Sequence, residues 1–426
     1  MLQILSRTLN VVIVVLSLNI AISVEAAVPP SAAELERIGL QLNWSGQAVL
    51  DPSRDTIRYL TNDEDLVYVQ SSGGVVSAFN AEVGRRMWVR QVGRNDAHSM
   101  PAVSNADLVV IVSGPDVFAL DKFTGEEMFR YRLARHPSAA PAIGDSTVYI
   151  PVSNRTIYGF SIKTLIHLSR YETLPPGVAR PYLWRWAANE RVEYPPVATE
   201  NVIAFGTTSR NLHAVSPAGI SYYQEFLNGP PSAPLAVDHH SERRAIVVAT
   251  KDRNLFSFDL TRGSLAWYLP LERRVSLQPL IVGHHVYLVM DAAGVACVST
   301  RSGDYEQIDD SIGATERWFV PGVESLVGVA GDHLYGVDRN RRIVAVSTAT
   351  AGVDGRAPMR GYSVHLQNSV TDRIYLASEA GELICLKPIG SDFATYHQRP
   401  DEQPLNIDVP FNDNDVDSED AGVRSE

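Results

Sequence analysis

The eleven-residue stretch AFNAEVGRRMW, residues 78–88, occurs again in related form as ALDKFTGEEMF at 119–129 and as SFDLTRGSLAW at 257–267. Each copy begins with a small residue and has an acid or amide two positions later, then glycine, and an aromatic ring at its end. These places are held by Ala78, Asn80, Gly84 and Trp88, by Ala119, Asp121, Gly125 and Phe129, and by Asp259, Gly263 and Trp267. A phrase that recurs within one chain indicates a repeat architecture.

Degenerate copies of this phrase run through the body of the chain. Aligned on the acid or amide, they fall at Asn80, Asp121, Ser161, Ser216, Asp259, Ser299, Ser347 and Lys387, which are 40 to 55 residues apart. Short β-rich runs such as LVYVQS (66–71) and AIVVAT (245–250) recur with them, and such a period is typical of propeller blades. We therefore expect an all-β, eight-bladed propeller with four-stranded blades. Seven blades are the alternative, because the sixth and seventh repeats are degenerate.

One spacing, the 55 residues between Ser161 and Ser216, is longer than the others. In several repeats a proline follows the aromatic position by about twelve residues, and Trp184 stands twelve residues before Pro196. Trp184 therefore takes the aromatic place of its repeat. The extra residues lie before it, around SRYETLPPGVARPY (169–182), where we expect one inserted loop.

The last repeat, IYLASEAGELICLKPIG (374–390), has no aromatic strand after it. The segment GLQLNWSGQAVL (39–50), with Trp44, has the pattern of that missing outer strand. An N-terminal strand that completes the last blade would remove the unpaired sheet edge of an open ring. We expect the ring to close in this way.

The repeated phrase is interpreted as a packing device and not as a catalytic motif. A flat blade buries both faces against its neighbours, so each joint needs a large flat side chain, which Trp88, Phe129, Trp184 and Trp267 would supply. The Asp or Asn is expected to accept turn N–H groups, and the glycine to supply the turn backbone.

The two ends of the chain differ from the body. Residues 1–26 have a basic residue, an apolar run and small residues before Ala27, which predicts a secretory signal peptide; an uncleaved anchor is the alternative. Residues 27–390 are expected to form the propeller. Residues 391–426 contain ten acidic and two basic side chains and few large apolar ones, which predicts an acidic disordered tail.

Charge and cysteine content exclude several classes of protein. The tail carries most of the net charge of −12, so the body has no basic excess of the kind that nucleic-acid binding requires. The two cysteines, Cys297 and Cys385, fall in the small-residue position of the phrase and are expected to be buried core residues. No Cys lies near the predicted cleavage site, so we expect no lipid anchor.

Metal binding is not expected either. The pairs His239-His240 and His284-His285 fall in equivalent turns and are interpreted as turn residues. Asp413, Asp415 and Asp417 alternate like the start of a calcium loop, but the glycine and glutamate of such a loop are missing from their places.

The phrase resembles the tryptophan-docking motif, Ala-x-Asp-x-x-x-Gly-x-x-x-Trp, of pyrroloquinoline-quinone (PQQ)-type β-propellers, over residues 40–390. That fold is shared by quinoprotein alcohol dehydrogenases and by non-enzymatic propellers similar to BamB, the outer-membrane β-barrel assembly factor. The dehydrogenases imply adjacent cysteines, a catalytic Asp and a Ca²⁺-binding set, none of which is found here. We therefore expect no enzyme activity and neither PQQ nor Ca²⁺ as a cofactor.

The resemblance to BamB-like proteins implies an exported, periplasmic or envelope-associated interaction platform without catalytic groups. Its expected partners are envelope or outer-membrane proteins bound through propeller-face loops, and the protein is expected to be a monomer. Aromatic and arginine residues favour interface hot spots, so the predicted contacts are Arg180, Tyr182, Arg185 and Trp186, with Trp318 as a second candidate. A small-molecule or glycan binder that uses the central funnel is the alternative, and a PQQ-dependent enzyme is the third.

Overall fold

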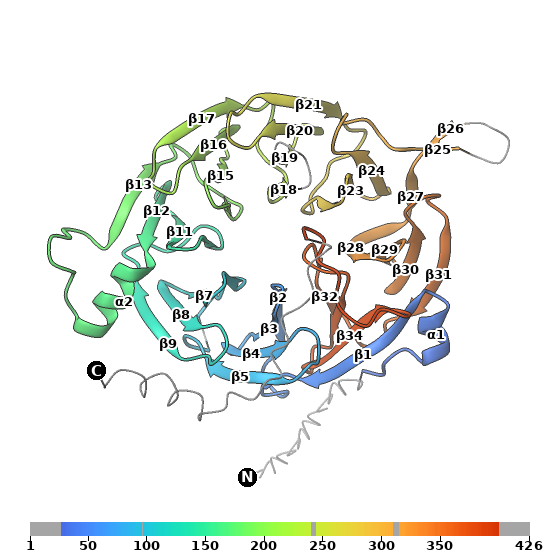
Figure 1. Cartoon of the computed structure of the whole chain (residues 1–426), viewed down its shortest axis with the longest axis horizontal. Coiled ribbons are helices and arrows are strands. Elements are labelled where there is room, and N and C mark those ends of the chain that lie inside the picture. Colours follow the sequence, from blue (N-terminus) through green and yellow to red (C-terminus); the bar gives the residue numbers. More distant parts are fainter. Residues whose placement is uncertain (1–26, 96, 240–243, 310–314, 400–426) are drawn as a thin grey trace, which may run out of the picture.

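The computed structural model describes residues 27–95, 97–239, 244–309 and 315–399. Its four-stranded antiparallel sheets are arranged as blades around a ring, which confirms the eight-bladed propeller (Figure 1). The signal peptide predicted at 1–26 and the acidic residues from 400 onward lie outside the described residues. Within the described part, no helix is long and apolar enough to cross a membrane.

The blades follow one another along the chain, each running from an inner to an outer strand. Blade 1 is β2 (Ile57–Asn62), β3 (Leu66–Ser71), β4 (Val75–Asn80) and β5 (Arg86–Gln91); blade 2 is β6 (Val103–Ser104), β7 (Leu108–Ser113), β8 (Asp116–Asp121) and β9 (Glu127–Arg132). Blade 3 is β10 (Ala142–Ile143), β11 (Thr147–Val152), β12 (Thr156–Ser161) and β13 (Tyr182–Ala187); blade 4 is β14 (Val197–Ala198), β15 (Ile203–Gly206), β16 (Asn211–Val215) and β17 (Ser221–Phe226).

The second half of the ring continues in the same way. Blade 5 is β18 (Ala236–Asp238), β19 (Ala245–Ala249), β20 (Asn254–Asp259) and β21 (Leu265–Pro270); blade 6 is β22 (Leu280–Val282), β23 (His285–Met290), β24 (Gly294–Ser299) and β27 (Phe319–Pro321). Blade 7 is β28 (Val323–Ala330), β29 (His333–Asp338), β30 (Arg342–Ser347) and β31 (Val353–Pro358); blade 8 is β32 (Val364–His365), β33 (Ile374–Ala377), β34 (Glu382–Pro388) and β1 (Leu40–Gln47).

The N-terminal strand closes the ring, as predicted. Strand β1 pairs antiparallel with β34, so that Trp44 lies opposite Cys385 and the first strand of the chain is the outer strand of the last blade. The short helix α1 (Ala32–Glu36) precedes β1, and Leu35 on it is buried in the core of blades 7 and 8.

Burial explains why the second strand of a blade is mostly apolar and the outer strand alternates. Every residue of β3 and of β7 is buried, because both faces of a blade interior are covered by neighbouring blades. In the outer strand β13, in contrast, half-buried and exposed positions alternate, because only one face meets the next blade. The core is consequently a series of apolar clusters between blades.

The repeated phrase forms the joints between blades. The indole N–H of Trp88 donates to the carbonyl of Lys122 in the next blade at 2.8 Å, and that of Trp267 donates to Thr300 at 2.7 Å. The Trp88 ring lies on Gly125, where a Cβ would stand 2.6 Å from it. Gly125 also has φ +70°, so the glycine serves the turn and the ring together.

The acid or amide of the phrase accepts turn N–H groups, as expected. Asp121 Oδ1 accepts from the N–H of Phe123 at 3.0 Å and of Thr124 at 2.8 Å, and Asp259 does the same two and three residues onward. Both cysteines are buried and unpaired, as predicted for small core residues.

Three features depart from the sequence interpretation. Trp318 was expected to be a partner contact, and this is wrong: it is 1% exposed and its indole donates to Thr348 at 2.8 Å, as a joint tryptophan does. Trp318 stands outside the sequence spacing of the repeats because a hairpin is inserted before it, formed by β25 (Gln307–Asp309) and β26 (Thr315–Arg317). The long insertion before Trp184 is not only a loop, because its first part is the helix α2 (Ile162–Tyr171).

The third departure concerns the C-terminal boundary. Disorder from residue 391 is wrong for the first nine tail residues, because 391–399 return to the ring. Thr371 pairs with Tyr396, and the N–H of His397 donates to Val370 at 2.9 Å. Tyr396 is 4% exposed. The folded body therefore extends to residue 399.

Candidate functional site at the mouth of the ring

The two ends of the blades form two faces. Turns between the first and second strands, and between the third and fourth, lie at one end, which we call the front face. Turns between the second and third strands, and the loops to the next blade, lie at the other end, the back face. Any site on the propeller is placed by these turns, since the strands themselves are packed.

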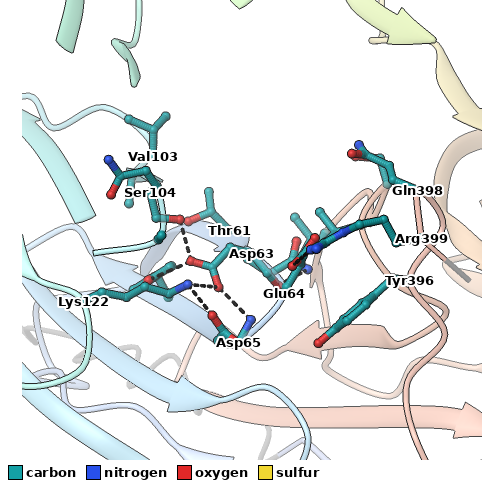
Figure 2. Close-up of a pocket in the computed structure, with 18 of the residues that line it drawn as sticks. Thr61, Asp63, Glu64, Asp65, Val103, Ser104, Lys122, Tyr396, Gln398 and Arg399 are labelled. Carbon is teal, nitrogen blue, oxygen red and sulfur yellow. Dashed lines mark hydrogen bonds and ion pairs between the residues drawn. The ribbon is translucent and has the colours of Figure 1, made fainter. Parts of the chain in front are cut away.

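A cleft of about 910 Å³ opens on the front face (Figure 2). It is formed where the turn 61–65 of blade 1 meets the turn 103–106 of blade 2, with Lys122 and Phe123 beside them. The opposite wall comes from residues 366–370 of blade 8 and from the returning tail, through Tyr396, Gln398 and Arg399. The cleft thus lies over the seam where the last blade meets the first.

A network of hydrogen bonds and ion pairs fixes one wall of the cleft. Lys122 is 3% exposed, and its Nζ lies 2.6 Å from Asp65 Oδ2 and 3.2 Å from Asp63 Oδ1. Asp63 Oδ2 also accepts from the Tyr68 hydroxyl at 3.0 Å and from Ser104 Oγ. Burial would lower the pKa of Lys122, but the two carboxylates outweigh it and raise that pKa. Lys122 is consequently a charged structural link between blades 1 and 2.

A second network lies deeper, between blades 8 and 1. The Arg373 side chain has no exposed surface, and its guanidinium contacts Glu82 at 2.8 Å, Asp372 at 3.0 Å and Ser391 Oγ at 3.2 Å. Burial raises the pKa of Asp372 in spite of the Arg373 charge beside it. Nearer the surface, Arg399 pairs with Glu64 and so fastens the end of the tail to blade 1.

The acidic side chains of the cleft are paired with cations. Asp63 and Asp65 are engaged by Lys122, and Glu64 by Arg399, so these carboxylates are already paired. Further polar lining comes from amides and hydroxyls, among them Asn62, Gln367, Ser369 and Gln398. Such groups donate and accept hydrogen bonds and do not exchange protons near neutral pH. Among the described residues, no three His, Cys, Asp or Glu side chains are grouped so as to hold a metal ion.

A smaller cavity of about 130 Å³ continues toward the opposite side of the mouth. It shares Gln367, Ser369 and Gln398 with the large cleft, and its remaining lining comes mainly from the inner strands of blades 5 and 6. The connection segment of blade 8 and the tail therefore project between two cavities.

The predicted contact residues on β13 are not one patch. Arg185 is exposed, but its neighbour Trp186 turns inward and packs on His213 of blade 4, with ring centroids 6.1 Å apart. Tyr182 also turns inward and packs on Tyr158 at 5.1 Å. Successive side chains of a strand point to opposite faces, so Arg185 and Trp186 cannot share a surface. The grouping of these two residues was wrong, and only Arg180 and Arg185 remain exposed.

Burial in the packing around Trp186 changes the pKa of His213. The ring of His213 stacks on Phe205 at 5.1 Å, and the residue is 2% exposed. Burial lowers the pKa of His213 to about 4, so the imidazole is neutral in the folded protein. The joint between blades 3 and 4 therefore contains a titratable group.

The helix α2 lies on the outer rim and not at the mouth (Figure 1). Leu165 on it is buried in the cluster that contains Phe129, and the backbone N–H of Arg130 on β9 donates to Ser169 Oγ at 3.4 Å. The insertion thus takes the place of the phrase glycine at the joint of blades 2 and 3.

Sequence reasoning missed the cleft itself. Its acidic turn Asp63-Glu64-Asp65 was visible, as was an aromatic residue, Tyr396, in an otherwise polar tail. Neither feature shows from the sequence alone that the tail and the turn meet, because 331 residues separate Asp65 from Tyr396.

Comparison with known proteins adds a family to this geometry. A family model described as outer membrane protein assembly factor BamB matches residues 95–219 and 178–393. The crystal structure of BamB from Moraxella catarrhalis superposes with a TM-score of 0.62 and 16% identity, covering 83% of this chain and 98% of that one. No protein of curated function matches the sequence.

Two further structures show how widely the fold is shared. The computationally designed Ika8 protein gives a TM-score of 0.55 at 13% identity, over 80% of this chain and 99% of its own. The Pan2 WD40 domain of Neurospora crassa gives 0.50 at 9% identity, over 83% and 97%. At such identities the likeness shows the fold alone.

Proposed function

The chain belongs to the PQQ-like propeller family described as outer membrane protein assembly factor BamB, and from that premise we propose an exported, non-catalytic platform that holds protein partners in the cell envelope. The finer part of the proposal is a BamB-like role in outer-membrane protein assembly. Its partners would be envelope or outer-membrane proteins bound by loops on a propeller face.

One observation carries the proposal. The residues that stand out in the sequence, the aromatic rings and acids of the repeated phrase, are used to hold the blades together. In the cleft, the ionisable groups that could serve as acid or base are paired with one another. What remains free for function is an array of loops on a rigid ring, which suits binding by surface complementarity.

The test is made in the native host. The gene is deleted, and the levels of outer-membrane β-barrel proteins are measured by quantitative mass spectrometry, with the wild-type gene restored as the control. We expect a several-fold fall that the wild-type gene reverses. Unchanged barrel-protein levels in the deletion strain would exclude the assembly role.

A second candidate, a binder of sugars or other polyols, is favoured by the cleft. Amides and hydroxyls line its 910 Å³, and an aromatic ring, Tyr396, lies among them. Calorimetric titration of the protein with oligosaccharides tests this candidate, and Gln398→Ala should weaken any binding that uses the cleft. Binding that is indifferent to Gln398 would place the ligand elsewhere.

A further inference from the structure

The turns between the second and third strands carry an unexpected residue in three neighbouring blades. In blades 1, 3, 4, 5, 7 and 8 this turn has a residue in the left-handed conformation whose carbonyl accepts the first N–H after the outer strand. In blades 1 and 8 the residue is glycine: Gly74 accepts from Val92 at 2.7 Å and Gly381 from Ala48 at 2.8 Å. Glycine is expected there because it has no Cβ.

In blades 3, 4 and 5, and again in blade 7 with Arg341 (φ 53°), the same position is arginine, and the first three are neighbours in the ring. Arg155, Arg210 and Arg253 have φ of 65°, 70° and 65°, and their carbonyls accept from the outer strands at 2.8 Å each. The left-handed conformation is unfavourable for a residue with a Cβ, and Asn or Asp tolerate it better than Arg. Backbone strain that recurs at one position indicates that the arginine side chain has a role there.

The three guanidinium groups are held in the same way. The Nη1 group of Arg155 donates to the carbonyl of Asn189 at 3.2 Å. In the same way, Nη1 of Arg210 donates to the carbonyl of Asn228 at 3.4 Å, and Nη1 of Arg253 donates to that of Glu272 at 3.4 Å. All three arginine side chains are exposed. Each anchor atom lies at the start of the loop to the next blade. One nitrogen is thereby fixed, while the remaining donors of each planar group are available at the back face.

The surroundings of this row are basic in an acidic protein. The back-face turns and loops of blades 3 to 5 (153–155, 188–196, 207–210, 227–235, 250–253 and 271–279) contain seven basic and four acidic side chains, in a chain of net charge −12. Three of the acids are partly satisfied by cations, Glu272 by Arg317 at 3.0 Å, Glu193 by Lys251 at 3.5 Å and Glu190 by Arg155 itself at 3.9 Å. The local field therefore favours an anionic partner.

An apolar side chain stands beside the row. Phe226 is 78% exposed, the highest value of any large apolar residue described. It ends β17 directly opposite Asn211, the residue after Arg210. Arginines with an exposed aromatic ring are a combination that protein interfaces favour.

We propose that Arg155, Arg210 and Arg253, with Phe226 beside them, form a binding surface for an extended acidic peptide segment of a partner protein. The inference rests on the proposed platform function and names the chemistry of one partner. Guanidinium groups held at one nitrogen present fixed donor pairs that match carboxylates. A lipid surface would require no such fixed geometry, so a peptide is the occupant that the structure favours.

The test measures binding of a defined acidic peptide to the full-length protein. The probe is fluorescein-labelled FNDNDVDSED, the sequence of residues 411–420, and the control probe has every Asp and Glu replaced by Asn and Gln. Fluorescence anisotropy should show binding of the acidic probe that weakens as salt is added, and at least tenfold weaker binding of the neutral probe.

The decisive variant is R155G/R210G/R253G, because glycine suits the left-handed turns and folding is preserved. We expect it to bind the acidic probe at least tenfold more weakly. R155K/R210K/R253K keeps the charge and loses the planar fork, and should fall in between. The matched control, R262Q/R301Q, removes two exposed arginines of the front face and should bind like the wild type.

Other results of the binding experiment would overturn or refine the inference. Equal binding by wild type and the triple glycine variant would overturn the inference, as would equal binding of both probes. Binding of phosphatidylglycerol vesicles without binding of the peptide would replace the peptide with a lipid surface. Peptide binding that appears only after D413N/D415N/D417N would support the surface and show that the chain's own acidic residues occupy it. Because barrel-protein levels are measured separately, failure of this inference and failure of the assembly role are distinguishable.

Discussion

The joint between blades 5 and 6 and the seam between blades 8 and 1 both hold neighbouring blades together, but through different contacts. In the joint, Trp267 lies on Gly303 and donates to Thr300 at 2.7 Å, and apolar contacts complete the packing. In the seam, Trp44 makes the same contact with Ala81 at 3.0 Å, but the buried Arg373 and the tail residue Arg399 are added. Both pairs of blades are joined by continuous chain, but blade 8 combines the N-terminal strand β1 with the C-terminal strands β32 to β34. The added polar links therefore connect residues from the C-terminal end of the chain, Arg373 and Arg399, to blade 1.

The largest effect is expected at the seam. Arg373→Met would leave the carboxylates of Glu82 and Asp372 without their buried partner and should lower the free energy of unfolding by about 3–5 kcal/mol. Urea unfolding measures the loss, and hydrogen exchange should show it first in blades 8 and 1. Loss of protection spread evenly over all blades would show that the seam is no special element.

The packing of the joint between blades 5 and 6 is tested by a substitution at its glycine. A Cβ at Gly303 would stand 2.5 Å from the Trp267 ring, and φ is +76°, so Gly303→Ala should cost about 2–4 kcal/mol of unfolding free energy. The control is Gly283→Ala, where φ is +60° and the space is open, with an expected cost of about 1 kcal/mol. Equal costs at both positions would show that the ring contact contributes nothing.

The joint of blades 3 and 4 should respond to pH. The pKa of His213 is about 4 in the folded protein and near 6.5 in the unfolded chain, so between these values only the unfolded state takes up the proton. Stability should therefore fall as the pH falls, by about 2 kcal/mol between pH 7 and 5 from this residue. In His213→Leu that part of the loss should disappear, and in the exposed control His136→Gln it should persist.

Trp318 allows a direct comparison of two joints. Its indole bond to Thr348 at 2.8 Å resembles that of Trp267 to Thr300, so Trp318→Phe and Trp267→Phe should each cost about 1 kcal/mol. Denaturant melts of the two variants make the measurement. If Trp318→Phe were neutral, Trp318 would not serve the joint.

The smallest effect on global stability is expected at the end of the tail. The pair Arg399–Glu64 is partly exposed, so Arg399→Gln should change the free energy of unfolding by less than about 1 kcal/mol. Limited proteolysis should nevertheless cut near residues 391–399 faster in the variant than in the wild type. An unchanged cleavage rate would show that the tail is held by Tyr396 and its backbone bonds alone.

Prediction of the blades succeeded where the chemistry is local. The turn at Asp121, Gly125 and the aromatic ring of each copy lie within eleven residues, so one period sets the strands, the turns and the ring that fills each joint. It failed for Trp318, because an inserted hairpin moved the residue along the sequence while leaving its place in space unchanged. The β13 grouping failed because strand alternation sends Arg185 and Trp186 to opposite sides.

The sequence by itself determined the family and the repeat, which follow from a short recurring pattern, and the closure of the ring by β1, which follows from the outer strand that the last repeat lacks and the N-terminus supplies. Only the tertiary structure decided that residues 391–399 return to wall the front cleft, and that the arginines of three separate turns form a row on the back face. These sites depend on contacts between segments far apart in the chain and on backbone angles. The order of residue types does not show which distant segments meet, because that is set only when the blades assemble into the closed ring.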